Sequence, residues 1–288
     1  VLIIKSGTGD VTISGTIGLA VDSELGGLKI NAGETTNSSD DKDGNITISA
    51  AIGGAPGGGD NDEPGVIGIT KIGNDATEDL NFGGALYSFN GATTITAAAG
   101  NTIDVGVDAE FSTVDDSLTF ATGTIELANA VDLTVNSSGG AITIDSIAGT
   151  TNGAGFETVT INANDGGAEA GADGETVSLG NVGDSSHTQI HNLSVSADDG
   201  ITLTGAIYTA DDGTKATVTL SDAVIIDGDV IIDTDDDQSH DGDITFTTSI
   251  EGKGDGGNES LTIEGGTGTI TLTAIGATTT VGNLSINT

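Results

Sequence analysis

The acidic side chains of this sequence are the residues best suited to chemistry, because they gather in short, glycine-rich stretches. Ca²⁺ takes roughly six to eight oxygen ligands, and closely spaced carboxylates in a loop can supply several of them. The EF-hand pattern is only half met, since Asp233 as first ligand places Gln238 and Ile244 where Gly and Glu are needed. Two interpretations therefore stay open, a calcium site and solvated acidic loops. The predicted calcium ligands are Asp233, Asp235, Asp237, Asp241, Asp243, Asp41 and Asp43.

Two other residue types could bind or be modified. His187 and His191 lie four residues apart and would share one face of a strand, so a transition-metal pair is an alternative to plain surface histidines. His240 is the third imidazole of the chain. Asn-x-Ser/Thr sequons accept N-glycans only where the host glycosylates secreted proteins. The predicted sequon asparagines are Asn37, Asn45, Asn136, Asn192, Asn258 and Asn283.

Catalysis is not expected of this chain. No GxSxG, P-loop or HExxH pattern is present. All six basic residues are Lys, and aromatics make up only 3%, which leaves few platforms for sugar stacking. A polysaccharide-active enzyme stays a third alternative, because glycoside hydrolysis needs only two carboxylates across a groove.

Short apolar–polar–apolar phrases recur along the whole chain and predict β-strands with one face buried. Gly, Asn and Asp separate the phrases and supply the turns. One set of phrases occupies 11–13, 46–48, 142–144, 201–203, 244–246 and 270–272. The other set occupies 28–30, 118–120, 133–135, 159–161, 193–195, 218–220, 261–263 and 284–286.

The spacing of these phrases predicts an all-β fold, a parallel β-helix or β-solenoid. The phrases often lie about nine residues apart, and wider gaps are rich in Gly and Asp, as expected for stacked coils of about 25 residues with loop insertions. A β-sandwich is the competing fold, but its wider core usually needs large aromatics. We expect one domain over 1–288, with an irregular insertion around 54–90 that contains Pro64.

Composition limits the partners of the chain. The net charge of −38 repels nucleic acid and anionic membranes and attracts divalent cations. The absence of Cys excludes disulfides and thiolate metal sites. No apolar stretch of 18 residues is present, so no membrane insertion is expected.

The phrases GDVTISGTIG, LTVNSSGGAITIDSIAGT and GGTGTITLTAIGATTTVGNLSINT resemble repeats of large bacterial surface proteins. These are the filamentous-haemagglutinin-like adhesins and the related β-helical S-layer or exoprotein family. The resemblance covers most of the chain as rhythm and composition, with no active-site motif. It implies a right-handed β-helix, secretion, and a role in attachment or surface structure.

The expected function is that of a non-enzymatic, extracellular structural protein, a rod that forms or decorates a cell-surface layer or filament. The two ends of the sequence share one pattern, so we expect either end-to-end stacking of copies or an internal piece of a longer repeat protein. The chain starts at Val1 and shows no signal peptide, which fits a processed chain or a segment. A calcium-dependent adhesin that binds surface glycans is the alternative, with Ca²⁺ as the one cofactor considered.

Overall fold

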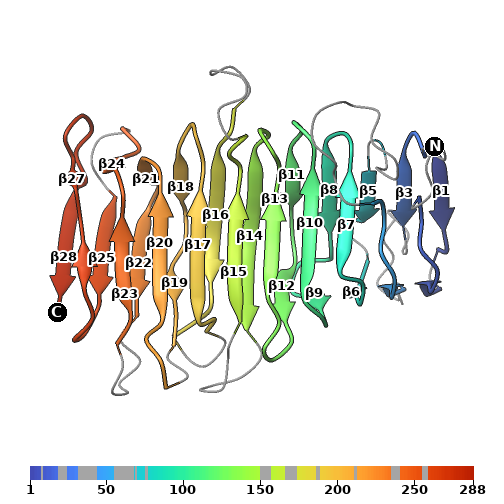
Figure 1. Cartoon of the computed structure of the whole chain (residues 1–288), viewed down its shortest axis with the longest axis horizontal. Coiled ribbons are helices and arrows are strands. Elements are labelled where there is room, and N and C mark those ends of the chain that lie inside the picture. The colour runs from blue at the N-terminus through green and yellow to red at the C-terminus, as the bar shows by residue number, and fades with distance from the viewer. Residues whose placement is uncertain are drawn as a thin grey trace.

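The protein is a β-solenoid, seen here in a computed structural model. The structure describes residues 1–7, 9–18, 25–31, 44–54, 68, 70–74, 77–149, 157–165, 174–185, 189–210, 213–234, 241–254 and 259–288. Within these ranges the regular structure is entirely β, and every strand pairing is parallel. The strands lie across a long axis in chain order, with the N- and C-termini at opposite ends (Figure 1). The predicted fold class is therefore confirmed, as a solenoid of about nine turns.

Each coil passes through three parallel ladders, which we name the first, second and third faces. The first and second faces belong to one sheet, because two long strands continue around the corner between them. The first face contains β1 (Leu2–Lys5), β3 (Leu28–Asn31), β5 (Thr70–Gly73), β8 (Thr93–Thr96), β11 (Leu118–Phe120), the starts of β14 (Ile142–Gly149) and β16 (Val177–Val182), β18 (Ile201–Leu203), β21 (Val224–Ile226), β24 (Ser249–Gly252) and β27 (Ala274–Ile275).

The other two faces follow the same order along the rod. The second face contains β2 (Val11–Ile13), β4 (Ile46–Ile48), β6 (Leu80–Phe82), β9 (Thr102–Val105), β12 (Thr124–Leu127), the ends of β14 and β16, β19 (Ile207–Tyr208), β22 (Asp229–Asp233), β25 (Ser260–Glu264) and β28 (Asn283–Asn287). The third face contains β7 (Leu86–Phe89), β10 (Ala109–Thr113), β13 (Leu133–Asn136), β15 (Thr158–Asn162), β17 (Asn192–Ser196), β20 (Thr217–Ser221), β23 (Asp243–Phe246) and β26 (Ile270–Thr271).

Coil length follows from the strand register. Leu118 pairs with Ile142, 24 residues later, and this spacing is typical of the rod. The pair Leu28–Thr70 spans 42 residues, because this coil has extra segments at 32–43 and 55–67. Within the predicted insertion around 54–90, strands β5, β6 and β7 pair into the ladders. The segment 55–67 lies outside the described residues, so an irregular insertion there stays a prediction.

The core is a set of apolar columns along the rod axis. On the second face, Ile46, Leu80, Ile103, Ile125 and Ile147 stack in register, and each is 0% exposed. Because every coil buries the same positions, apolar side chains of similar size stack on one another with little void. The alternation of buried and partly exposed residues along the strands confirms the predicted period of two.

A small aromatic cluster interrupts this aliphatic stack. The rings of Tyr87 and Phe111 stack with centroids 4.6 Å apart, and Phe82 and Phe120 meet Phe111 edge to face. The Tyr87 hydroxyl accepts a hydrogen bond from the Gly84 N–H and donates one to the Ile48 carbonyl. Burial raises the pKa of Tyr87 to about 12. Among the described residues, six aromatic side chains are therefore buried in the core, whereas Tyr208 is half-buried.

The outer surface of the third face is a row of hydroxyl side chains. Thr and Ser fill the central outward position in six successive coils, as expected for β-branched polar residues on a pleated surface. The row contains Thr134, Thr160, Ser194, Thr219, Thr245 and Thr271.

The right-handedness of the β-helix, which the resemblance implies, stays a prediction.

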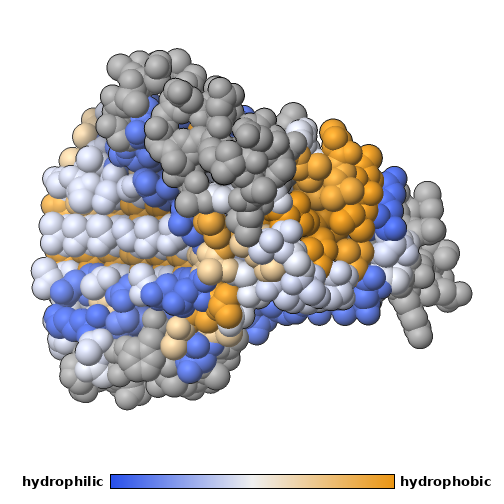
Figure 2. Space-filling view, turned by 45° about the vertical axis from the view of Figure 1, so that its right-hand side comes forward, coloured by the Kyte–Doolittle hydropathy of each residue, from blue (hydrophilic) through white to orange (hydrophobic). Residues whose placement is uncertain are grey.

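The core is open at both ends of the rod. Leu2 in β1 is 39% exposed, whereas its ladder partner Leu28 is 1% exposed. Ile286 in β28 is 40% exposed, whereas its partner Ile263 is 0% exposed. Figure 2, which brings the N-terminal end forward, shows an apolar patch at that end.

Candidate functional site

Many acidic side chains at the corners bind the backbone of the next coil. Before the second face, Asp10 Oδ1 accepts the Asn45 N–H at 3.0 Å, and Asn45 Oδ1 accepts the Asp79 N–H at 3.1 Å. Asp79 Oδ1 then accepts the Thr102 N–H at 3.1 Å. Corners are the places where the chain leaves the ladder, so these side chains replace the backbone partners lost there. Some of the acidic residues of this chain therefore have a structural role.

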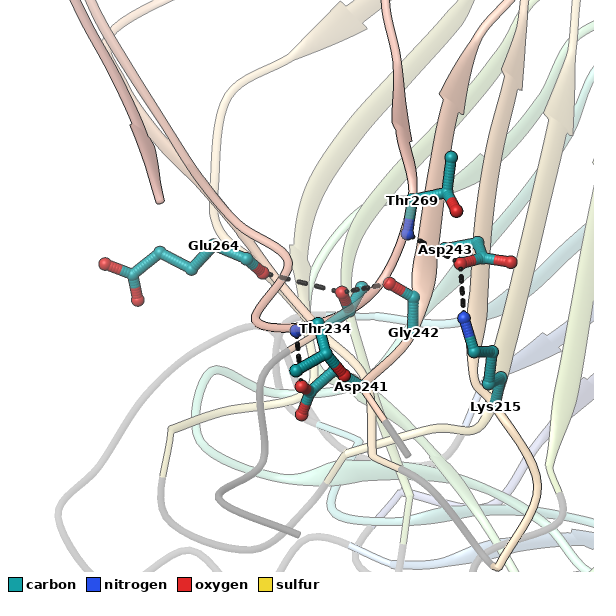
Figure 3. A network of polar contacts seen from close by, with 8 residues as sticks. Lys215, Thr234, Asp241, Gly242, Asp243, Glu264 and Thr269 are labelled. Atoms are coloured by element: carbon teal, nitrogen blue, oxygen red, sulfur yellow. Dashed lines mark hydrogen bonds and ion pairs between the residues drawn. The ribbon is translucent and has the colours of Figure 1, made fainter. Parts of the chain in front are cut away.

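The densest predicted acidic cluster includes the same kind of contact (Figure 3). Asp243 Oδ1 accepts the Thr269 N–H at 2.7 Å and an N–H from Lys215 Nζ at 3.0 Å. The Thr269 N–H and then Lys215 hold the pKa of Asp243 below its usual range. Asp241 Oδ2 accepts the Thr267 N–H of the same following coil. Asp241 and Asp243, two of the predicted calcium ligands, therefore both bind the backbone of the next coil.

Of the remaining predicted ligands, only Asp233 belongs to the described residues. Asp233 lies at the end of β22, where it pairs in register with Tyr208 and Glu264. A calcium site in these loops stays a prediction, because four of its members, Asp235, Asp237, Asp41 and Asp43, lie outside the described residues.

A different group of carboxylates converges at the corner between the third and first faces. One oxygen each from Asp165, Glu175 and Asp198 lie within 4.8 Å of one another. Asn164 Nδ2 donates to Asp198 Oδ1 at 2.7 Å, which fixes that carboxylate. Burial, followed by the charges of Asp165 and Asp198, raises the pKa of Glu175. Three hard oxygen donors at this separation could hold a cation such as Ca²⁺.

The coil geometry explains how this group forms. Asp165 follows β15, Asp198 follows β17, and Glu175 precedes β16. Gly139 follows β13 at the same corner, and a Cβ there would lie 3.7 Å from Glu175 Oε1. Asp198 and Asp199 are adjacent acidic residues in the sequence. No sequence signal joins Asp198 to Asp165 and Glu175, because their contact depends on a coil whose length includes an insertion.

Two buried glutamates have no hydrogen-bond partner among the described residues. Both carboxyl oxygens of Glu157 and both of Glu259 are inaccessible to water. Burial raises the pKa of Glu157, and the nearby backbone N–H groups of Glu157 and Ala130, followed by His191, oppose this effect. Glu157 and Glu259 each follow a segment outside the described residues and immediately precede β15 and β25. An unpaired buried carboxyl favours its neutral form, because ionisation without water is costly.

The predicted histidine and sequon residues lie in different environments. His191 is 6% exposed, and its Nδ1 lies 3.1 Å from the Ala210 carbonyl oxygen, so it is not a surface histidine. The oxygens of Asn45, Asn136 and Asn192 accept hydrogen bonds, whereas Asn283 is exposed in β28. The other members of these sets, His187, His240, Asn37 and Asn258, lie outside the described residues.

Comparison with known proteins adds no family to this fold. No family model matches the chain, and neither a curated protein nor a solved structure matches it. The resemblance to bacterial surface repeats therefore stays a prediction. Within the described ranges, no helix is long and apolar enough to cross a membrane.

Proposed function

We propose that this protein is a non-catalytic structural rod, extracellular, that forms or decorates a cell-surface layer or filament. The observation that carries the proposal is the parallel pairing that continues from β1 to β28 on the first two faces. Each coil is joined to the next by three backbone ladders and by a continuous apolar core. Such a stack resists bending and stretching, because every deformation must break several ladders at once.

The surface chemistry supports this role. The third face has a row of hydroxyls in six successive coils, and six aromatic rings lie in the core. The net charge of −38 keeps such rods apart and soluble in salt water. Other copies of the chain are the proposed partners, and nucleic acid is not one, because phosphate contacts need Lys and Arg.

The test is electron microscopy of cells that make the protein, with gold-labelled antibody against residues 1–288. We expect label on the outside of intact cells, over filaments or a layer of uniform width. Cells that lack the gene are the control and should show no label. Label confined to the cell interior would refute the proposed location, and label without an ordered layer or filament would refute the structural role.

A second function, that of a calcium-dependent adhesin for surface glycans, is supported by the group of Asp165, Glu175 and Asp198. Millimolar Ca²⁺ should then raise the melting temperature more than Mg²⁺ does, since a cation that binds only the folded state stabilises it. Asp198→Asn should abolish this difference, whereas Asp199→Asn should retain it, because Asp199 is outside the group. Equal responses to both cations would refute the calcium site, and no glycan retention with Ca²⁺ present would refute the adhesin.

A further inference from the structure

Lysine is scarce in this chain, yet three of its six lysines lie on one stretch of the first face. The strands β1, β3, β5, β8 and β11 contain Lys5, Lys29 and Lys71 and no acidic residue. Among the described residues, the lysines that form ion pairs are Lys215 and Lys253, and the three lysines of this stretch form none. This part of the first face is therefore locally basic, on a chain whose net charge is −38.

The register of the ladder places two of these lysines side by side. Lys29 pairs with Lys71 at the outward position of adjacent strands, and both side chains are at least partly exposed. Their neighbours in the same column are Ile3 and Thr94, which carry no charge. Lys29 and Lys71, which we name the lysine pair, are thus two adjacent positive charges without a counter-charge inside the rod.

A matching pair of carboxylates lies on the second face. Asp104 of β9 pairs in register with Glu126 of β12, and both are partly exposed. Their neighbours in the column are Asn81 and Ala148, which again carry no charge. Neither carboxylate forms a hydrogen bond or an ion pair with another residue of the described ranges. We name Asp104 and Glu126 the acidic pair.

We propose that the lysine pair of one copy binds the acidic pair of a second copy, so that rods associate side by side. This inference deepens the proposed structural role and rests on it for its biological meaning. Both pairs repeat at the strand spacing of about 4.8 Å, so each ammonium group meets one carboxylate. The uncharged neighbours of both pairs add no like-charge contact to this register.

The net charge of the rods limits the strength of this contact. Two copies of net charge −38 repel each other at long range. The Debye length is about 10 Å at 0.1 M salt, so charges away from the contact are largely screened while those in contact still attract. Opposite charges across an interface fix its register more than they add affinity. We therefore expect weak association that is lost at high salt.

The positions of the two pairs explain why this contact builds a layer or filament. The lysine pair lies in β3 and β5, and the acidic pair lies on another face in β9 and β12, two coils further along the rod (Figure 1). A contact between unlike surfaces leaves one surface of each kind free in every complex. Further copies add to those free surfaces, so the assembly stays open.

An anionic polysaccharide is the other partner that suits the lysine pair. It offers no counter-charge to the acidic pair, which would stay unpaired. A second copy supplies both counter-charges at the same spacing, so one contact accounts for both pairs. The second copy is therefore the occupant that the charges favour.

The test uses charge reversal in the full chain. Lys29→Glu/Lys71→Glu makes both pairs acidic, and Asp104→Lys/Glu126→Lys makes both pairs basic. Circular dichroism checks that each variant keeps its β structure. Analytical ultracentrifugation then measures mass, in multiples of 28.2 kDa.

We expect the wild-type chain to associate at about 0.1 M NaCl and to be monomeric at about 1 M NaCl. Each reversed variant alone should be monomeric at the lower salt, with association weakened on the order of tenfold or more. An equal mixture of the two variants should associate again, because the acidic pairs of one variant meet the basic pairs of the other. This restoration is specific to contact between the two pairs.

A matched control separates this contact from the effect of net charge. Lys29→Gln/Lys71→Gln and Thr160→Glu/Thr219→Glu change the net charge by the same amount, and the second variant alters outward positions of the third face. The glutamine variant should be monomeric at about 0.1 M NaCl, whereas the third-face variant should associate as the wild type does. Equal behaviour of these two variants would contradict the inference.

Three further outcomes overturn it. A wild-type chain that is monomeric at both salt concentrations removes the contact, and its retention on dextran sulfate through Lys29 and Lys71 would assign the lysine pair to an anionic polysaccharide. Association of either reversed variant alone shows unspecific charge attraction. A mixture that stays monomeric shows that the pairs do not recognise each other. Surface labelling of cells is independent of these results, so a failed contact and a failed structural role are distinguishable.

Discussion

At the scale of single residues, the acidic and amide side chains at the corners accept hydrogen bonds from backbone N–H groups, in place of backbone carbonyls. Asn45 and Asp79 occupy equivalent positions in successive coils and accept the same kind of backbone N–H. An acceptor oxygen, which Asn and Asp share, is therefore the common feature of these two corner positions. Acidity and cation binding are therefore separate questions in this chain, and each Asp must be judged by its own contacts.

Asp79 allows this idea to be tested. Asp79→Ala should lower the free energy of unfolding by about 1–3 kcal/mol, because the Thr102 N–H loses its acceptor. Asp79→Asn should stay within about 0.5 kcal/mol of the wild type, because Asn retains Oδ1. Urea unfolding measures both. Equal losses in the two variants would show that the charge, and not the hydrogen bond, stabilises this corner.

Glu157 gives a second prediction, on pH. Burial raises its pKa above the ordinary value of 4.5. Its contribution to stability is therefore full below that value and is lost as the pH rises through the pKa of the folded state. Glu157→Gln has no such ionisation, so its stability relative to the wild type should increase as the pH rises from about 5 to 8.

Thermal unfolding across this pH range measures the effect. The His191 and Asp132 charges also act on Glu157, so the comparison is made between two proteins that share them. A constant difference between the two proteins at all pH values would contradict the assignment of a neutral buried carboxyl.

At the scale of elements, the corner between the first and second faces depends on close backbone contact. β16 crosses this corner at Gly180, where an added Cβ would lie 1.9 Å from the carbonyl oxygen of Asp145 in the preceding coil. The two strands β14 and β16 pair on both sides of the corner, so they cannot separate to make room. Glycine is required there by space and not by its φ angle.

Gly180→Ala should therefore destabilise the rod by about 2 kcal/mol or more, as expected for overpacking against backbone. Gly106→Ala is the matched control, because the nearest atom to its Cβ would be the Phe82 carbonyl oxygen at 3.9 Å. That control should be neutral or slightly stabilising, since Ala restricts the unfolded chain. Similar melting temperatures for the two variants would refute the close approach.

At the scale of the whole molecule, stacking places like charges one above another. Asp104 and Glu126 are neighbours on the second face, and burial, Asp104 and Asp79 raise the pKa of Glu126. Strand neighbours lie about 4.8 Å apart, well within a Debye length of about 10 Å at 0.1 M salt. The rod therefore gains stability when salt screens these rows.

Raising NaCl from about 20 mM to about 0.5 M should raise the melting temperature by a few degrees. The double variant Asp104→Asn/Glu126→Gln should show a smaller rise, because one repelling pair has been removed. Calorimetry at matched pH measures both. A melting temperature that does not respond to salt would mean that the acidic rows are already neutralised, by protons or by bound cations.

The sequence by itself determined the β-solenoid, its period of about 25 residues and its alternating core. It could do so because every coil must bury the same inward positions, so the pattern is repeated along the chain. The two sets of strand phrases do not correspond to two faces: in one set, 11–13 lies on the second face, 142–144 on the first and 244–246 on the third, because strands of all three faces share one apolar–polar–apolar pattern.

Only the tertiary structure decided which polar residues meet. Asp165, Glu175 and Asp198 converge because the coils place residues from three segments at one corner, and the insertion in that coil hides the relation in the sequence. In the same way, the contacts of Asp241 and Asp243 with Thr267 and Thr269 of the next coil are defined only by the folded chain. The sequence repeat reflects the inward apolar positions that every coil shares. Contacts between side chains at the corners depend instead on distances that only the folded chain defines.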